Sequence, residues 1–248
     1  MVDCAVSSMT GVPLVEFPRD RSIGSADHEI KFAVPASAAD PLRAWVSSVC
    51  RPDAAHPPAR VWTVYFDTPG LSLLSEKIDS DYLKTKVRVR WYGAIDGRAS
   101  PVFAEVKQRV GIRRDKTRVE LDVTPAELER LPLHEARWPA LLATLRAAVP
   151  TLPARLAPVL CLSYTRHRFV DPAVPARLGI DSDIRVTEVN TTMIHGHVPV
   201  GLDHAVFEYK GRLFDLPPHL RPIVRFGARR QAFSKYLACY QAVSALVL

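Results

Sequence analysis

The chain of 248 residues is long enough for one large domain or two small ones with a buried core. Its apolar content of 48% and charged content of 24% are ordinary for a soluble globular protein. No stretch approaches the roughly 18 apolar residues of a membrane span, and the N-terminus lacks the basic and apolar segments of a signal peptide. We therefore expect a cytoplasmic protein without a transmembrane segment.

The charge balance favours an anionic partner. Lysine and arginine number 33 against 26 aspartate and glutamate residues, which gives a net charge of +7 and a pI of about 9.4. Such a balance suggests nucleic acid, a nucleotide, polyphosphate or an acidic surface as the partner. Cys4, Cys50, Cys161 and Cys239 lack the spacing of a metal site, so we expect reduced and mostly buried thiols.

The chain divides into a tail and one domain. Residues 1–25 show no periodicity and are interpreted as a flexible tail, and residues 26–248 as a single domain. Alternating apolar and polar residues then predict a series of strands, in chain order over residues 29–32, 61–66, 84–92, 103–109, 116–122, 159–169, 177–185 and 205–210.

Three helical segments are predicted. Thr124-Pro125-Ala126-Glu127 combines an N-cap threonine, a first-turn proline and a capping-box glutamate, and residues 135–149 continue as a second helical piece. A closing helix is predicted over about residues 228–246, with Phe233, Tyr236, Leu237 and Tyr240 on its apolar stripe. In this reading Arg229 and Arg230 form a solvated or helix-adjacent charge pair.

The strand over residues 84–92 carries the most informative pattern. Lys84, Lys86, Arg88 and Arg90 project to one face, because side chains alternate along a strand. Like charges on one strand face repel each other unless counter-charge lies beside them. The counter-charge is either acidic residues of the protein or an anionic ligand such as phosphate. Lys84 is the member that we most readily assign to solvent.

Nearly every predicted strand has one charged and one apolar face. For any single strand, a charged face in water explains this pattern. The alternative is a sheet closed into a barrel, with a polar, cation-rich lumen and apolar outer faces covered by helices. The fold class is α+β in either case.

The order of the motifs resembles that of a known family. The motifs are Glu29-x-Lys31, Tyr65-Phe66-Asp67-Thr68, Lys86-x-Arg88-x-Arg90-x-Tyr92, Glu105-x-Lys107, Lys116-x-Arg118, Tyr164-x-Arg166, Arg177-x-x-x-Asp181, Glu208-x-Lys210 and Ser234-Lys235-Tyr236. The set resembles the VTC domain of polyphosphate polymerases, within the triphosphate tunnel metalloenzyme (CYTH-like) superfamily. The resemblance implies an antiparallel eight-stranded β-barrel tunnel with a charged lumen, flanking helices and a C-terminal capping helix.

The resemblance also implies roles for individual residues. Arg88, Arg90 and Lys235 are the expected catalytic residues. Glu208, with Glu29 or Glu105, is expected to hold Mn²⁺ or Mg²⁺, although Glu208 could instead pair with Lys210 and Glu105 could orient neighbouring cations. The expected phosphate- or nucleotide-binding residues are Lys31, Lys86, Arg88, Arg90, Lys107, Lys116, Arg118, Arg166, Arg168, Arg177, Lys210, Ser234, Lys235 and Tyr236.

Three functions are compatible with the resemblance. The first is a polymerase that transfers the γ-phosphate of ATP, or of another nucleoside triphosphate, to inorganic polyphosphate. The second is a tripolyphosphate or nucleoside-triphosphate hydrolase, in which Asp27, Glu29 or Glu105 orients water. The third is a non-catalytic polyphosphate-binding module. No nucleic-acid partner is expected, because the basic residues have no aromatic stacking platform beside them. A membrane partner could recruit the protein.

Overall fold

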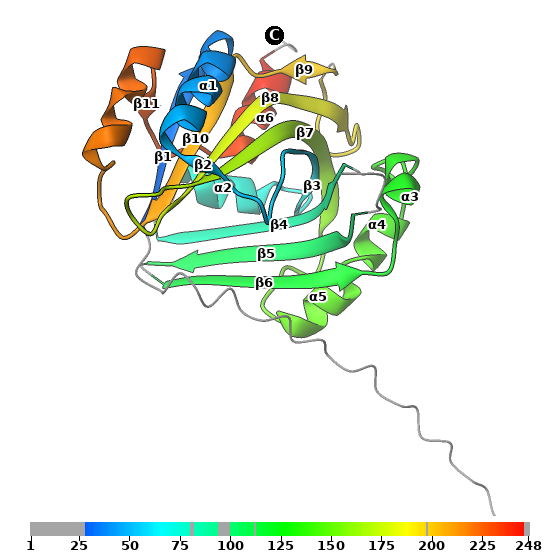
Figure 1. Ribbon diagram of the computed structural model, residues 1–248. Coiled ribbons are helices and arrows are strands. Elements are labelled where there is room, and N and C mark those ends of the chain that lie inside the picture. The colour runs from blue at the N-terminus through cyan, green and yellow to red at the C-terminus, as the bar shows by residue number, and fades with distance from the viewer. Residues whose placement is uncertain (1–27, 80–81, 94–99, 112, 197, 246–248) are drawn as a thin grey trace, which may run out of the picture.

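The computed structural model describes residues 28–79, 82–93, 100–111, 113–196 and 198–245. The tail assigned to residues 1–25, together with Asp27 and Cys4, lies outside them. All the predicted strands are present, and they join one antiparallel sheet (Figure 1). In chain order the eight long strands are β1 (His28–Pro35), β3 (Ala59–Asp67), β4 (Leu83–Tyr92), β5 (Val102–Val110), β6 (Arg113–Leu121), β7 (Ala157–Val170), β8 (Arg177–Val189) and β10 (His204–Gly211).

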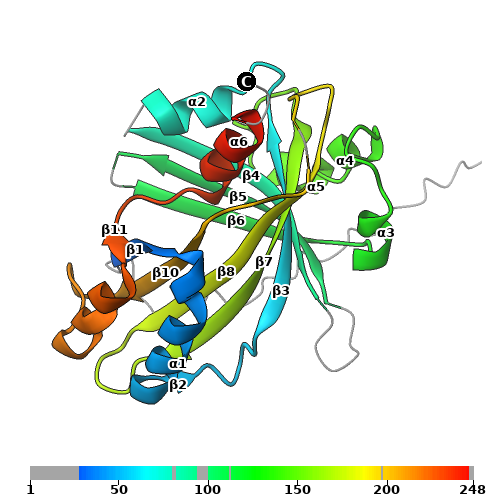
Figure 2. The ribbon, with the colours of Figure 1, turned by 90° about the horizontal axis from the view of Figure 1, so that it is seen from above.

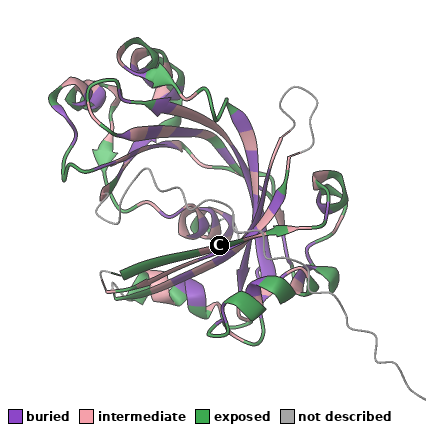
Figure 3. Ribbon diagram, turned by 60° about the horizontal axis from the view of Figure 1, so that its bottom comes forward, coloured by how far each residue is buried: buried purple, intermediate pink, exposed green. Residues whose placement is uncertain are grey.

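Three two-residue strands complete an 11-stranded sheet, namely β2 (Arg51–Pro52), β9 (Val200–Gly201) and β11 (Arg229–Arg230). The strands lie in the order β11-β1-β10-β8-β7-β3-β4-β5-β6, with β2 beside β7 and β9 beside β8. The sheet curls so that β4, β5 and β6 form one wall and β7, β8, β10 and β1 form the other, joined through β3 (Figures 1 and 3). We call these the β4 wall and the β1 wall.

The prediction of a closed eight-stranded barrel is wrong. Among the described residues, no backbone pairing joins β6 to β1 or β11, so the sheet stays open between its two end strands. The end strand β6 is exposed along most of its length (Figure 3) and carries Arg113, Arg114, Lys116 and Arg118, while β11 is a pair of arginines. Charged side chains on edge strands oppose pairing between edges, and here both edges are cationic.

Helices cover the outer faces of the sheet. The β4 wall packs its apolar face against α3 (Pro125–Glu129), α4 (Arg137–Ala140) and α5 (Ala143–Ala148), with Trp138 and Leu145 fully buried. The β1 wall packs against α1 (Ala39–Val49), which follows the short η1 (Ala36–Ala38), and against η2 (Pro218–Phe226). The charged strand faces therefore point inward, as the barrel interpretation predicted.

A third apolar cluster lies at one end of the curled sheet. It includes buried residues of β3, β7 and β8 and is covered by α6 (Lys235–Ser244), which contributes Tyr236, Cys239 and Val243. Seen from above, α6 lies between β8 and α2 (Ser72–Asp79) (Figure 2). The predicted closing helix is thus shorter than expected, because residues 229–230 pair with β1 and the helix begins only at Lys235.

The capping box at Thr124 and Glu127 is present as predicted, and Cys50, Cys161 and Cys239 are buried free thiols. The sequence interpretation did not include α1, α2 or η2. Within the described part of the chain, no helix has the length and apolar character needed to cross a membrane.

Candidate functional site

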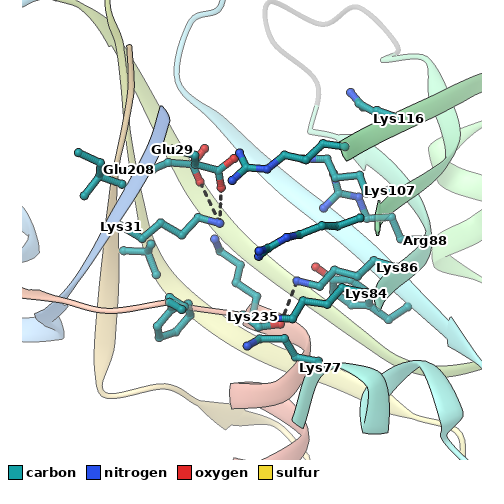
Figure 4. A pocket seen from close by; sticks show the side chains of 18 of the residues that line it. Glu29, Lys31, Lys77, Lys84, Lys86, Arg88, Lys107, Lys116, Glu208 and Lys235 are labelled. Carbon is teal, nitrogen blue, oxygen red and sulfur yellow. Dashed lines mark hydrogen bonds and ion pairs between the residues drawn. The ribbon is translucent and has the colours of Figure 1, made fainter. Parts of the chain in front are cut away.

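A cavity of about 820 Å³ lies between the two walls. Thirteen lysine and arginine residues line it, against three carboxylates, Glu29, Asp115 and Glu208. Figure 4 shows lysines and an arginine from both walls and from α2 and α6 pointing into the same space. A concave surface with such an excess of one sign attracts anions, because the low-dielectric walls focus the field. The lining cations are Lys31, Lys77, Lys84, Lys86, Arg88, Arg90, Lys107, Arg109, Arg114, Lys116, Arg166, Arg230 and Lys235.

Most of the predicted phosphate-binding residues meet in this cavity. They are Lys31, Lys86, Arg88, Arg90, Lys107, Lys116, Arg166, Ser234 and Lys235. Three others, Arg168, Arg177 and Lys210, line a second pocket of about 390 Å³. The two pockets share the lining residues Glu29, Arg114, Arg166 and Glu208, so they adjoin.

Two predicted ligands, Arg118 and Tyr236, line neither of these pockets. The Arg118 guanidinium stacks on the ring of Phe103 at 3.5 Å, and its Nε lies 3.2 Å from Glu105. The Tyr236 hydroxyl donates a hydrogen bond of 2.9 Å to the buried carboxylate of Asp67. Both side chains therefore support the walls rather than the cavity surface.

The sequence interpretation missed several lining cations. Lys84 lines the cavity, so its assignment to solvent is wrong. Lys84 and Arg109 alternate in step with predicted ligands on their strands, so this pattern could have identified both as lining residues. Arg230 is 58% exposed, as a solvated pair with Arg229 predicts, and it also lines the cavity, because β11 places it beside Phe32 of β1. Lys77 of α2 and Arg230 could not be predicted from an alternating strand pattern, because neither lies in such a pattern.

Glu105 organises the cations of the β4 wall. Its carboxylate, 2% exposed, accepts from Arg88 Nε at 2.7 Å and also lies 3.3 Å from Lys116 and 3.2 Å from Arg118. Burial would raise the pKa of Glu105, but Arg88, Arg90, Lys116 and Arg118 outweigh it and hold that pKa well below its usual range. With its oxygens engaged by three cations, Glu105 fits the orienting role that the sequence left open.

Three lysines, which we call the lysine row, lie side by side on the inner face of the β4 wall. Lys86 pairs with Lys107 in the β4–β5 register, and Lys107 with Lys116 in the β5–β6 register. Lys86 donates to Ser234 at 3.2 Å, but among the described residues Lys107 has no carboxylate within ion-pair distance. Burial, with repulsion from neighbouring cations including Arg88, lowers the pKa of Lys86 to about 8 and that of Lys107 to about 7.

Asp181 organises the cations of the β1 wall, and the sequence interpretation assigned it no role. Arg166 donates to both of its oxygens, from Nε at 2.5 Å and from Nη2 at 2.6 Å, and Lys235 Nζ lies 2.5 Å from Oδ2. Burial would raise the pKa of Asp181, but Arg166 and Lys235 hold it well below its usual range. The arrangement fixes a guanidinium of β7 and an ammonium of α6 at the cavity surface.

The Ser-Lys-Tyr segment connects α6 to several parts of the sheet. Ser234 accepts from Lys86 of the β4 wall, and Lys235 reaches β8. Tyr236 bonds to Asp67 at the end of β3, whose carboxylate also accepts from backbone N–H groups in the first turn of α2. These contacts hold the start of α6 against the cavity.

Glu29 and Glu208 are the candidate metal ligands that the structure brings together. They lie on the adjacent strands β1 and β10, and Lys31 pairs with Glu29 and lies 3.7 Å from Glu208 (Figure 4). Burial would raise the pKa of Glu208, but Lys210, Lys31 and Arg166 hold it well below its usual range. Mg²⁺ is commonly held by one or two carboxylates together with substrate phosphates, so this pair fits such an ion.

Within the described residues, no group of three or more histidine, cysteine, aspartate or glutamate side chains is placed to hold a metal. A cation bound by Glu29 and Glu208 would therefore need phosphate or water oxygens to complete its coordination.

Comparison with known proteins gives one family match. A family model described as the VTC domain matches residues 26–244. No curated protein matches the chain.

Three solved structures of low sequence identity are among those similar to this chain. A Hippeastrum protein described as an adenylyl cyclase with a dominant triphosphatase activity is 14% identical, with a TM-score of 0.49 over 85% of this chain and 93% of its own. Adenylate cyclase-type proteins from Vibrio parahaemolyticus and Bacillus halodurans are 12% and 14% identical, with TM-scores of 0.42 and 0.44 over 85% and 75% of this chain and 95% and 82% of theirs.

The lysine row predicts proton uptake on anion binding. With pKa values of about 8 for Lys86 and about 7 for Lys107, both amines lose charge as the pH rises from about 7 to 9. An anion favours the protonated amines, so tripolyphosphate affinity should fall over that range and binding at pH 8 should take up about one proton. Titration calorimetry in two buffers of different ionisation enthalpy measures this number. Uptake that is zero, and unchanged in Lys107→Met, would contradict the prediction.

The Asp181 cluster predicts a large stability cost for a small change. Asp181→Asn should lower the free energy of unfolding by about 3 kcal/mol, because Arg166 and Lys235 lose their buried counter-charge. Asp183→Asn is the matched control on the same strand, since Asp183 also pairs with two arginines but is 44% exposed. The control should cost less than about 1 kcal/mol. Urea denaturation compares the two variants, and equal losses would refute a special role for Asp181.

Proposed function

Because the chain belongs to the VTC domain family, we propose that it is a metal-dependent polyphosphate polymerase that transfers the γ-phosphate of ATP to a growing inorganic polyphosphate chain. The cavity supports this proposal, with thirteen cations against three carboxylates in about 820 Å³. A phosphate chain carries about one negative charge per unit, so cations at successive depths make a matching surface. The lysine row lies across three strands and suits an extended anion rather than a single ion.

In the proposed reaction, an oxygen of the terminal chain phosphate attacks the γ-phosphorus of ATP. A new P–O bond forms there, the bond to the β,γ-bridging oxygen breaks, and ADP leaves with the electron pair. Phosphoryl transfer of this kind needs positioning and charge neutralisation rather than a protein nucleophile. Arg88 and Arg90 act from the β4 wall, and Arg166 and Lys235 from the β1 wall and α6.

The cations of the cavity differ in how firmly they are held. Arg88 and Arg166 are each held by a buried carboxylate, so little side-chain entropy is lost when phosphate oxygens bind. Lys107 has no such partner among the described residues and is available to pair with the phosphate itself. We propose that Glu29 and Glu208 hold Mn²⁺ or Mg²⁺, which when bound would neutralise charge on the phosphates.

Hydrolysis is the second candidate function. The two carboxylates Glu29 and Glu208 adjoin both pockets, where either could orient a water molecule toward a bound triphosphate. Asp27, which the sequence also offered for this role, lies outside the described residues. The present contacts of Glu29 and Glu208 are with Lys31 and Lys210, which neutralise them.

Incubation with ATP and Mn²⁺ should yield long polyphosphate chains and ADP. Lys107→Met should lower this turnover by roughly tenfold or more, the cost of losing one charge-assisted contact to phosphate. Its thermal stability should not fall, since Lys107 forms no ion pair among the described residues. Arg113→Met is the control for charge, because Arg113 is 79% exposed and lines neither pocket.

The products separate the three candidate functions. Polyphosphate gel electrophoresis and orthophosphate release are measured on the same samples. Rapid cleavage of tripolyphosphate without chain synthesis from ATP would replace the polymerase with a hydrolase. Binding without any turnover would leave a polyphosphate-binding module.

A further inference from the structure

The cavity reaches the open edge of the sheet. Among the described residues, β6 at one end of the sheet pairs with neither β1 nor β11 at the other end. Both end strands nevertheless contribute cations to the cavity lining, Arg114 and Lys116 from β6 and Arg230 from β11. We call the gap between β6 on one side and β1 and β11 on the other the seam. The cavity lining therefore extends to both sides of the seam.

The exposure of the cavity cations shows that the seam is open to solvent. On the strands within the sheet, the side chains of Arg88 in β4 and Arg166 in β7 are 12% and 18% exposed. On the two end strands, Lys116 in β6 is 48% exposed and Arg230 in β11 is 58% exposed. Exposure of the lining thus rises toward both edges of the sheet, and β6 is exposed along most of its length (Figure 3). The end-strand cations face water across the seam and not an opposing strand.

The charge along the seam suits an anion. Arg114 and Lys116 lie on one edge, and Arg229 and Arg230 on the other. Arg230 has a carboxylate beside it, since its Nη1 lies 3.7 Å from Asp215, but both side chains are more than half exposed. Exposed ion pairs of this kind contribute little, so they leave the edge cations available to a stronger anionic partner. A polyanion between the edges would also relieve the repulsion that opposes their approach.

We propose that a phosphate chain enters the cavity sideways through the seam, so that the site takes internal segments of inorganic polyphosphate as well as chain ends. The inference rests on the proposed function, because it takes the cavity as the site for chain phosphate. A closed tunnel admits a chain only when a free end is threaded through it. An open seam lets any stretch of the chain be laid between the walls. Every internal phosphate carries a negative charge and two unbridged oxygens, so it offers lysine and arginine the same contacts wherever it lies in the chain.

An internal segment must continue beyond the cavity in both directions, and the structure provides for this. Arg114 and Arg166 line both the main cavity and the second pocket, and the second pocket adds Arg168, Arg177 and Lys210. A chain that lies between the walls can therefore continue along a cationic surface into the second pocket. The seam gives the rest of the chain a second way out.

A chain without an accessible end tests the proposal. Polyphosphate long enough to project from the cavity in both directions is coupled to biotin at both ends, and monovalent streptavidin then blocks each end with a protein too bulky to thread. Competitive titration calorimetry against tripolyphosphate, in EDTA so that no metal supports turnover, compares the blocked chain with the same chain before streptavidin is added. Both chains should compete with affinities within about twofold of each other, because the same phosphates make the same charge-assisted contacts.

Two variants show whether the blocked chain occupies the cavity. Lys107→Met removes a lining cation and should weaken both chains by roughly tenfold, the cost of one charge-assisted contact. Arg113→Met removes a cation of β6 that is 79% exposed and lines neither pocket, and it should change either affinity by less than about twofold.

The other outcomes overturn sideways entry. Binding of the free-ended chain alone would show that the cavity is threaded from an end, and the proposed function would stand. Binding of the blocked chain that Lys107→Met leaves unchanged would place that chain on another surface. If neither chain competes, sideways entry is refuted, and the proposed function falls with it only if tripolyphosphate does not bind either.

Discussion

Cations crowded on the inner face of a curled sheet repel one another, and two buried carboxylates make that crowding tolerable. Glu105 in the β4 wall contacts Arg88, Lys116 and Arg118, and Asp181 in the β1 wall contacts Arg166 and Lys235. Each carboxylate neutralises part of its wall and fixes the geometry of the cations around it. Even so, the cavity lining keeps thirteen cations against three carboxylates, and this excess of positive charge favours an anion.

The lysine row shows how the excess positive charge of the cavity affects the folded protein. Burial and repulsion lower the pKa values of Lys86 and Lys107, which means that the folded protein charges these amines less readily than an unfolded chain would. A bound anion would oppose both effects, because its charge favours the protonated amines. The open sheet follows from the same excess of charge, since cationic edge strands oppose the pairing that would close it.

The sequence predicted the strands and their inward charged faces because a period of two is a local property of the chain. Arg88, Lys107 and Glu208 could be found in this way, together with the family resemblance that orders them. The pairing of Arg166 and Lys235 on Asp181 could not be found, because it joins α6 to two strands through contacts 15 and 54 residues apart in the chain. Arg230 was missed for a related reason. Two adjacent arginines carry no strand period, and only the pairing of β11 with β1 turns one of them toward the cavity.

Closure of the barrel was the principal error, and its cause is also non-local. Whether two edge strands meet depends on the charges that face each other across the gap, which no single strand reveals. For a similar reason Tyr236 lies outside the cavity lining, and Glu105 takes the orienting role that the sequence left open beside metal binding. A carboxylate or hydroxyl that alternates in step with ligands along the chain can still be engaged in hydrogen bonds to neighbouring side chains of the protein.

We propose above all that the excess positive charge of the cavity is a site for chain phosphate. The most direct measurement is the melting temperature of the parent protein titrated with tripolyphosphate, against sodium chloride at matched ionic strength. A ligand that binds only the folded state stabilises it in proportion to the logarithm of its concentration above Kd. The melting temperature should rise steadily with micromolar to millimolar tripolyphosphate and stay nearly constant in chloride. Equal responses to the two salts, or none to either, would show instead that the inward cations form an internally satisfied sheet face.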